Sequence, residues 1–153
     1  MDNTPIVVLA IFGLCLLALA LWLILRPKRS CQITLVNDYR RRHRMRPVTA
    51  YHRLDGFASA HSRYLAKYEA CNHDRFQDRA DRIIAVTGTR HVGENCIQYP
   101  SPEYDDNIAV QLIEEWMESP EHRANILNPG FTKMGVGVVV KGRYVYATQI
   151  FCA

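Results

Sequence analysis

The sequence lacks internal repeats, low-complexity segments and any excess of glycine or proline, which number 8 and 7 among its 153 residues. Collagen-like and disordered chains are therefore excluded, since both depend on a strong compositional bias. It also lacks a C-x-x-C pair, which argues against a zinc site built from thiolates. A G-x-S-x-G nucleophile elbow is missing too, so nothing supports a serine hydrolase of the α/β type. No nucleic-acid fold signature is present, and we expect no nucleic-acid partner.

Charged side chains are missing from one long segment, residues 6–25. Its length matches the roughly 20 residues that a helix needs to cross a bilayer. We expect a short tail over residues 1–5, a transmembrane helix over 6–26, through which the protein binds the membrane, and a basic linker over 27–30. No basic segment precedes the run, which is also longer than the apolar part of a usual signal peptide. An uncleaved anchor is therefore favoured.

Four of the five cysteines follow this segment, at Cys31, Cys71, Cys96 and Cys152. An even number outside the membrane suggests two disulfides, with three possible connectivities. We expect Cys31–Cys152, which would join the two ends of a domain over residues 31–153. We also expect Cys71–Cys96, which would close an inner loop.

Two arguments disagree about the side of the membrane on which this domain lies. Paired cysteines require an oxidising compartment. Arg26, Lys28 and Arg29 follow the apolar run, and positive charge beside a membrane helix favours the cytoplasmic side. We take the cysteines as the stronger signal and expect a single-pass membrane protein with an extracytoplasmic domain.

Five arginines stand within seven positions, at Arg40, Arg41, Arg42, Arg44 and Arg46. Such a cluster can bind nucleic acid or lipid phosphate, and beside a membrane anchor the lipid is the nearer partner. A solvated helix face is the preferred interpretation, because arginine runs on helices are usually exposed.

The spacing of apolar residues predicts a first helix through Leu35 to His43, a second over residues 54–68 and a third over 108–116. Ser119 as N-cap and Pro120 at the first helical position predict a short fourth helix. His61 lies on the apolar stripe of the second helix and is interpreted as a core histidine rather than a ligand.

The rest of the domain is expected to hold loops and one β-hairpin. Residues 70–104 lose the helical period and contain scattered glycine and proline, so loops are expected there. Residues 135–140 and 143–151 are rich in β-branched and aromatic side chains around Lys141 and Gly142, which predicts a hairpin. Helices followed by a hairpin indicate an α+β domain with helices packed on a small antiparallel sheet.

Short motifs run through this region in a fixed order. They are Asn37 to Arg40, the helix from Leu54 to Ala66, His73, Gly93-Glu94-Asn95, Trp116, Ser119 to Leu127, Gly135 to Val138 and Tyr146 to Phe151. In order and spacing they resemble the CAP superfamily, also called SCP domains (cysteine-rich secretory proteins, antigen 5 and pathogenesis-related 1 proteins), and its microbial branch in particular. The resemblance covers residues 31–153. It implies a three-layer α-β-α sandwich with a central cleft, usually secreted or displayed outside the cell.

In many members of that family the cleft holds two histidines and two glutamates that bind a divalent metal. His73 matches the first histidine and Glu94 the first glutamate, whereas Ser119 and Tyr146 stand where the other two would be. Two protein ligands are fewer than a zinc site normally has. The resemblance therefore implies at most a weakly bound divalent metal at His73 and Glu94, with His122 as a candidate third ligand.

The ligand cleft expected from this match consists of His73, Glu94, Asn95, Ser119, His122, Tyr146 and Gln149. Some of these residues could instead have structural roles. Glu94 and Asn95 could hold the cleft strand in place, and His122 could fix its loop by hydrogen bonds.

Two functions from different classes are consistent with these residues. The first is a membrane-anchored, non-enzymatic binding module for a lipid, sterol, peptide or envelope ligand, which requires no cofactor; lipid and sterol binding is known in the family. The alternative is a metal-assisted hydrolase, for which His73, Glu94 and His122 are the candidate catalytic residues. A plain interaction surface is a third option.

Overall fold

The structure, a computed structural model, describes residues 31–101 and 107–153. The tail expected over residues 1–5, the transmembrane helix over 6–26 and the linker over 27–30 lie outside the described residues. Within the two described ranges, no helix is long and apolar enough to cross a membrane.

The described chain combines helices with a four-stranded sheet, which confirms the α+β class. A helix covers residues 31–42. The later elements are β1 (Thr49–Ala50), α2 (His52–Tyr68), α3 (Phe76–Thr87), β2 (Val92–Pro100), α4 (Ile108–Glu118), α5 (Pro120–Ile126), β3 (Lys133–Lys141) and β4 (Tyr144–Cys152).

The strands lie in the order β1-β3-β4-β2, so β4 is an inner strand and β2 is an edge strand. β4 pairs antiparallel with β3 and with β2 along all nine of its residues, from Tyr144 to Cys152. β3 and β4 form the predicted hairpin. Its turn contains Gly142 at φ 58°, a left-handed conformation that glycine adopts without the steric penalty other residues meet.

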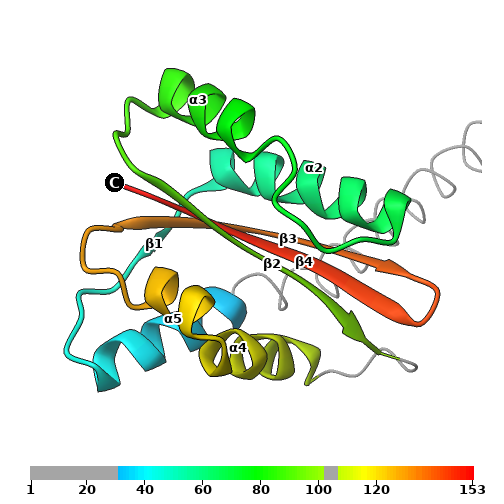
Figure 1. The fold of residues 1–153 in the computed structure, drawn as a ribbon. Coiled ribbons are helices and arrows are strands. Elements are labelled where there is room, and N and C mark those ends of the chain that lie inside the picture. The colour runs from blue at the N-terminus through cyan, green and yellow to red at the C-terminus, as the bar shows by residue number, and fades with distance from the viewer. Residues whose placement is uncertain (1–30, 102–106) are drawn as a thin grey trace, which may run out of the picture.

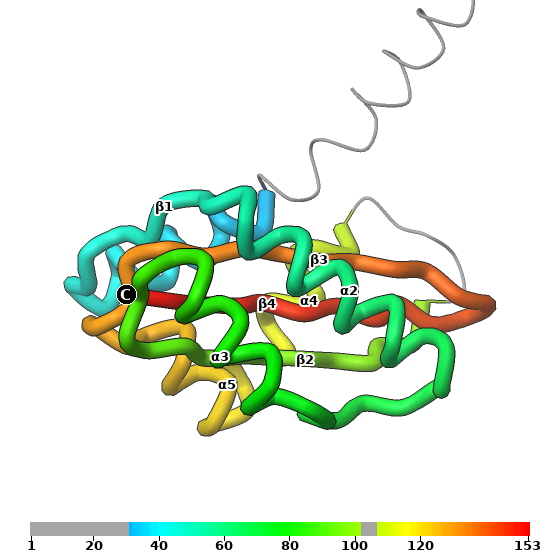
Figure 2. The backbone as a smooth tube through the Cα atoms, turned by 90° about the horizontal axis from the view of Figure 1, so that it is seen from above, coloured from blue at the N-terminus to red at the C-terminus, as the bar shows by residue number. Residues whose placement is uncertain are grey.

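Helices cover both faces of the sheet, as the resemblance implies (Figure 1). α2 and α3 lie on one face, where α2 runs along β3 and α3 lies nearer β2 (Figure 2). The helix over residues 31–42, α4 and α5 lie on the other face. We name the two sides of the sheet the α2/α3 face and the α4/α5 face.

Side chains alternate between these faces along each strand. On β4, Ala147 and Phe151 belong to the cluster around Trp116 on the α4/α5 face, whereas Ile150 packs with Leu54 on the α2/α3 face. β3 has glycine where α2 crosses it. A Cβ built on Gly137 would lie 2.3 Å from the backbone carbonyl carbon of Ala58, so only a residue without a Cβ allows this close approach.

Two elements occupy the region where loops were expected. α3 buries only Ala80 and Ile83, so its apolar pattern is too sparse to predict a helix. β2 buries Glu94 and Asn95 beside its apolar residues. Because these buried residues are polar, the alternation that normally indicates a strand is hidden.

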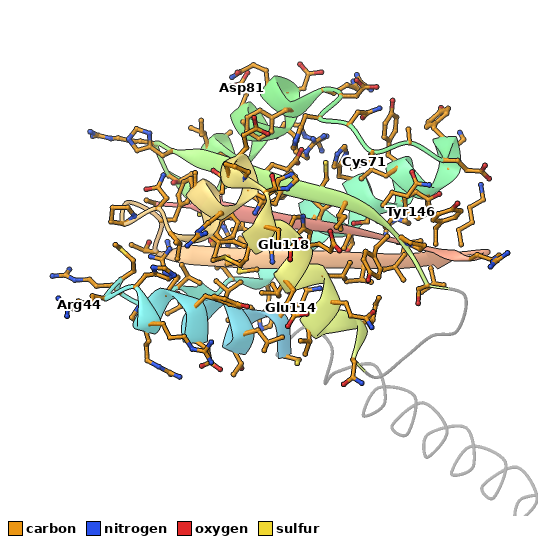
Figure 3. All side chains as sticks on the ribbon, turned by 60° about the horizontal axis from the view of Figure 1, so that its bottom comes forward. Arg44, Cys71, Asp81, Glu114, Glu118 and Tyr146 are labelled. Atoms are coloured by element: carbon orange, nitrogen blue, oxygen red, sulfur yellow. The ribbon has the colours of Figure 1, made fainter. Side chains whose placement is uncertain are left out.

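The arginine cluster does not form a uniform solvated face. Arg40 is fully buried, and its guanidinium donates to the carbonyl oxygens of Arg46, Ile126, Asn128 and Phe131. Its neighbours are exposed, among them Arg44 beyond the end of the helix (Figure 3). Arg40 therefore ties the first helix to the loop that follows α5, and only the rest of the cluster is solvated.

Neither expected disulfide is formed, and the four cysteines of the described ranges are free thiols. For Cys31–Cys152 the reason is topological. Cys152 packs with Leu54 and Ile83 on the α2/α3 face, whereas Cys31 belongs to a helix on the opposite face. Cys71 and Cys96 are neighbours, with their Sγ atoms 3.8 Å apart, which is longer than the roughly 2.05 Å of a disulfide bond.

Candidate functional site

Glu94 on β2 is the centre of a buried ionic cluster on the α2/α3 face. Its side chain is 1% exposed, and Arg79 of α3 donates to both oxygens, from Nε to Oε2 at 2.6 Å and from Nη2 to Oε1 at 2.7 Å. His73, from the loop between α2 and α3, places Nδ1 3.0 Å from Oε1. His61 of α2 places Nε2 3.5 Å from the same oxygen. Three segments thus converge on one carboxylate.

The carboxylate of Glu94 is ionised despite its burial. Removal from water raises its pKa, but hydrogen bonds from His73 and Arg79 and the positive charges near it outweigh that effect and hold the pKa below its ordinary value. Two parallel N–H···O bonds from one guanidinium are among the strongest pairings available to a carboxylate. Glu94 is therefore an anion whose charge is matched inside the protein.

The two histidines beside Glu94 differ in exposure and protonation. The hydrogen bond to Glu94 raises the pKa of His73, whose side chain is 50% exposed. Burial lowers the pKa of His61, although Glu94 opposes that shift. His61 Nε2 also lies 3.0 Å from the carbonyl oxygen of Asn72, so this nitrogen carries the proton and donates. His73 is the solvent-facing histidine of the cluster, and His61 is the buried, neutral one.

The expected cleft is divided between the two faces of the sheet. His73 and Glu94 are brought together on the α2/α3 face, where Tyr146 is also buried, beside Leu65 and Cys96. Asn95 and Gln149 lie on the α4/α5 face instead, because successive residues of a strand point to opposite sides. The seven residues therefore do not line a single cleft.

On the α4/α5 face the expected residues have structural roles. Asn95 Nδ2 donates to the carbonyl oxygen of His122 at 3.1 Å and to Gln149 Oε1 at 3.2 Å. Asn125 Nδ2 donates to Asn95 Oδ1 at 2.8 Å. Ser119 is the N-cap residue of α5, as predicted, but its hydroxyl makes no capping hydrogen bond. These contacts hold α5 against β2.

His122 lies near the cluster without joining it through a contact of its ring. Burial lowers the pKa of His122, and the charge of His73 lowers it further. The two imidazoles are therefore close enough to interact electrostatically. The backbone carbonyl oxygen of His122 accepts a hydrogen bond from Asn95 Nδ2, which helps to hold α5 against β2.

Arg79 and His61 are the two members of the cluster that the sequence patterns did not assign to a site. His61 was predicted to be a core residue, and it is 3% exposed, but it also contacts Glu94. Arg79 belongs to a helix that the apolar pattern did not reveal. Arg79 lies four residues before Ile83 and next to Ala80, the two residues that α3 buries, so it stands on the helix face that packs against the domain, and this spacing was the available signal.

The residues do not fit the divalent metal that the family resemblance implies. A cation would have to approach a carboxylate whose two oxygens already accept from Arg79, against the positive charge of that guanidinium. Among the described side chains, no group of three or more His, Cys, Asp or Glu is arranged to hold a metal ion. The guanidinium of Arg79 would therefore compete with a metal for the same carboxylate.

A groove of about 580 Å³ opens above this cluster, between α2 and α3. Its lining alternates charge with apolar and aromatic surface, and consists of Phe57, Ala60, His61, Tyr64, Asp74, Arg75, Asp78, Arg79, Asp81 and Arg82. A ligand in this groove would lie against His61 and Arg79 and would therefore contact the partners of Glu94 directly.

Comparison with solved structures identifies bacterial proteins of the same fold. An extracellular SCP-domain protein from Bacillus anthracis superposes with a TM-score of 0.66 at 28% identity, over 82% of this chain and 40% of its own. An outer surface protein of Borrelia burgdorferi gives a TM-score of 0.69 at 12% identity, over 83% of this chain and 92% of its own. The second likeness concerns the fold alone.

Sequence comparison points to the same group. The uncharacterized protein YkwD of Bacillus subtilis is 53% identical over 32 residues, which are 21% of this chain and 12% of that protein. This chain thus spans less than half of the Bacillus proteins that it matches. The family model described as "CAP: Cysteine-rich secretory protein family" matches residues 33–152. Since that match covers most of the sequence and the fold agrees with it, the chain belongs to the CAP, or cysteine-rich secretory protein, family.

Proposed function

We propose that this protein is a CAP-domain binding module, held at a membrane by residues 6–26 and displayed outside the cytoplasm. Its groove between α2 and α3 takes a cell-envelope ligand. The observation that carries the proposal is the two-point pairing of Arg79 with Glu94, because it commits the buried acid of the cluster to a partner within the chain. The extracellular SCP-domain protein of Bacillus anthracis supports the location.

The lining of the groove favours one of the expected ligand classes. Three aspartates and three arginines lie among Phe57 and Tyr64, so the groove offers both signs of charge next to aromatic surface. A sterol would remove water from these charged groups and offer them almost no hydrogen bonds in return, which is unfavourable. A peptide of the envelope carrying both amino and carboxyl groups could pair with them and stack on the aromatic rings.

A metal-assisted hydrolase is the less favoured function. It would need Glu94 as a ligand or as a general base, and in either role the carboxylate would have to give up hydrogen bonds or act beside a fixed positive charge. Arg79 and His73 engage both oxygens. His122, the third candidate, belongs to α5, and its backbone carbonyl oxygen accepts from Asn95.

Native mass spectrometry of the full-length protein, extracted gently from its own membrane, tests the proposal. We expect an organic adduct that survives a chelator. Ala60→Trp places an indole in the groove that Ala60 lines, and it should remove the adduct. Ala85→Trp is the matched control, since Ala85 is exposed on α3 but does not line the groove, and it should retain the adduct.

Other outcomes would contradict specific parts of the proposal. A metal adduct that the chelator removes, together with hydrolysis lost in Glu94→Gln, would support the hydrolase. An adduct retained in Ala60→Trp would move the binding site away from this groove. Protection of the domain from protease added outside intact cells would place it in the cytoplasm.

A further inference from the structure

Cys71 and Cys96 are two free thiols placed in contact. Cys71 lies in the loop over residues 69–75, beside β2 (Figure 3), and Cys96 lies on β2 itself. Their Sγ atoms are 3.8 Å apart, and a disulfide would bring them to about 2.05 Å. A small movement of the loop could therefore form the bond.

The two thiols differ strongly in access. Cys71 is exposed, whereas Cys96 is 2% exposed and its thiol donates to the carbonyl oxygen of Asn72 at 3.3 Å. An external molecule can therefore reach Cys71, and it can reach Cys96 only through Cys71. A solvent-accessible thiol beside a shielded second thiol suits thiol–disulfide exchange, because the accessible sulfur reacts with an external disulfide and the shielded sulfur completes the reaction.

We propose that Cys71 and Cys96 form a thiol–disulfide exchange site, with Cys71 as the attacking sulfur and Cys96 as the resolving sulfur. The oxidant is an organic disulfide, either a small molecule or a protein. Cys71 loses its proton, and its thiolate attacks one sulfur of that disulfide. An S–S bond forms between them, the S–S bond of the oxidant breaks, and the other sulfur leaves as a thiolate that takes up the proton lost by Cys71. Cys96 then attacks Cys71 Sγ, which releases the second sulfur, and the proton of Cys96 passes to a released thiolate. Two electrons and two protons move from the pair to the oxidant, which becomes two thiols.

The same geometry argues for a reversible bond rather than a permanent staple. A disulfide that solvent reaches is reduced more easily than a buried one, and Cys71 keeps one side of this bond exposed. The bond would also affect the ionic cluster, since Cys96 Sγ lies 3.8 Å from both ring nitrogens of His73. Oxidation would tie the loop that carries His73 to β2 and fix that imidazole beside Glu94.

The test uses the full-length protein in detergent, equilibrated with glutathione buffers from fully reduced to fully oxidised. Each sample is quenched with acid, free thiols are alkylated, and peptide mass mapping locates bonds and blocked cysteines. We expect the Cys71–Cys96 bond to appear and disappear within this range. In Cys96→Ser, Cys71 should stop at a mixed disulfide with glutathione. Cys31→Ser is the matched control and should leave the titration unchanged.

Each remaining result would overturn the proposal. A pair that stays reduced in oxidised glutathione is not an exchange site. A bond that persists in fully reduced buffer is a permanent structural disulfide. Glutathione retained on Cys71 in the parent protein would show that Cys96 does not resolve it. The parent titration decides the first two alternatives even if Cys96→Ser does not fold.

Discussion

Arg79 lies against Glu94 as an internal counter-ion, with two short hydrogen bonds between side chains that are 12% and 1% exposed. The pair joins α3 to β2, and α3 contributes few apolar contacts of its own. The placement of this helix, and with it one wall of the groove, therefore depends on this ion pair as well as on the burial of Ile83 in the core.

Removing Arg79 should be strongly destabilising. In Arg79→Ala, Glu94 would stay buried without its main partner, and we expect a loss of about 3 kcal/mol in the free energy of unfolding, measured by urea denaturation. Arg75→Ala is the control, because Arg75 pairs with Asp78 in an exposed i,i+3 bridge. Its effect should stay within about 0.5 kcal/mol. Equal losses in the two variants would contradict the central role of the Arg79–Glu94 pair.

The stability contributed by His73 should depend on pH with a defined sign. Its pKa is raised in the folded state by the hydrogen bond to Glu94, so the folded protein holds the proton more tightly than the unfolded chain. The contribution is fully present below the unfolded value of about 6.5. It is lost as the pH rises through the folded pKa. The difference in urea midpoint between the parent and His73→Gln should therefore shrink as the pH increases, and a difference that grows with pH would contradict this assignment.

A methyl group at Gly137 should disturb the packing of α2 on the sheet. The Cβ of Gly137→Ala would meet the backbone of Ala58 and Ser59 at 2.3 Å, and backbone cannot rotate away as a side chain can. We expect a loss of about 3 kcal/mol in unfolding free energy. Gly56→Ala, on the exposed side of α2 with nothing within 4 Å of its Cβ, should instead stabilise the protein by about 0.5–1 kcal/mol through helix propensity.

Arg40 and Arg42 should behave differently although they are two residues apart. Arg40→Met leaves the buried carbonyl oxygens of Ile126 and Phe131 without their donor, and we expect a loss of about 3 kcal/mol in thermal or urea unfolding. Arg42 is exposed and lies over the ring of Tyr39, so Arg42→Met should change the unfolding free energy by less than about 1 kcal/mol. Similar effects would show that the cluster is a solvated face after all.

The sequence predicted those elements whose stability comes from a continuous apolar stripe. α2 buries Leu54, Ala58 and Leu65, and α4 buries Ile108, Leu112 and Trp116, so the helical period is visible in both. The β3–β4 hairpin is rich in β-branched residues around a glycine turn. The family resemblance then added the three-layer arrangement and indicated His73 and Glu94 as site residues.

The missed features depend on polar contacts between segments far apart in the chain. β2 carries Glu94 and Asn95 as buried residues because Arg79 satisfies the first and α5 satisfies the second. Neither partner can be read from the strand itself. The same reason explains the division of the expected cleft, since the motif Gly93-Glu94-Asn95 places adjacent side chains on opposite faces once it is known to be a strand.

The position of β4 inside the sheet constrains how the domain can fold during synthesis. β4 follows β1, β2 and β3 in the chain, yet both β2 and β3 pair with it along its full length. Until residues 144–152 have left the ribosome, β2 and β3 lack the strand that lies between them and pairs with both. Sheet formation must therefore wait for this segment, and pairing between distant parts of a chain is the slow class of folding event. Until then the exposed strand edges are open to pairing with other chains, so folding and aggregation should compete in the interval before β4 is inserted.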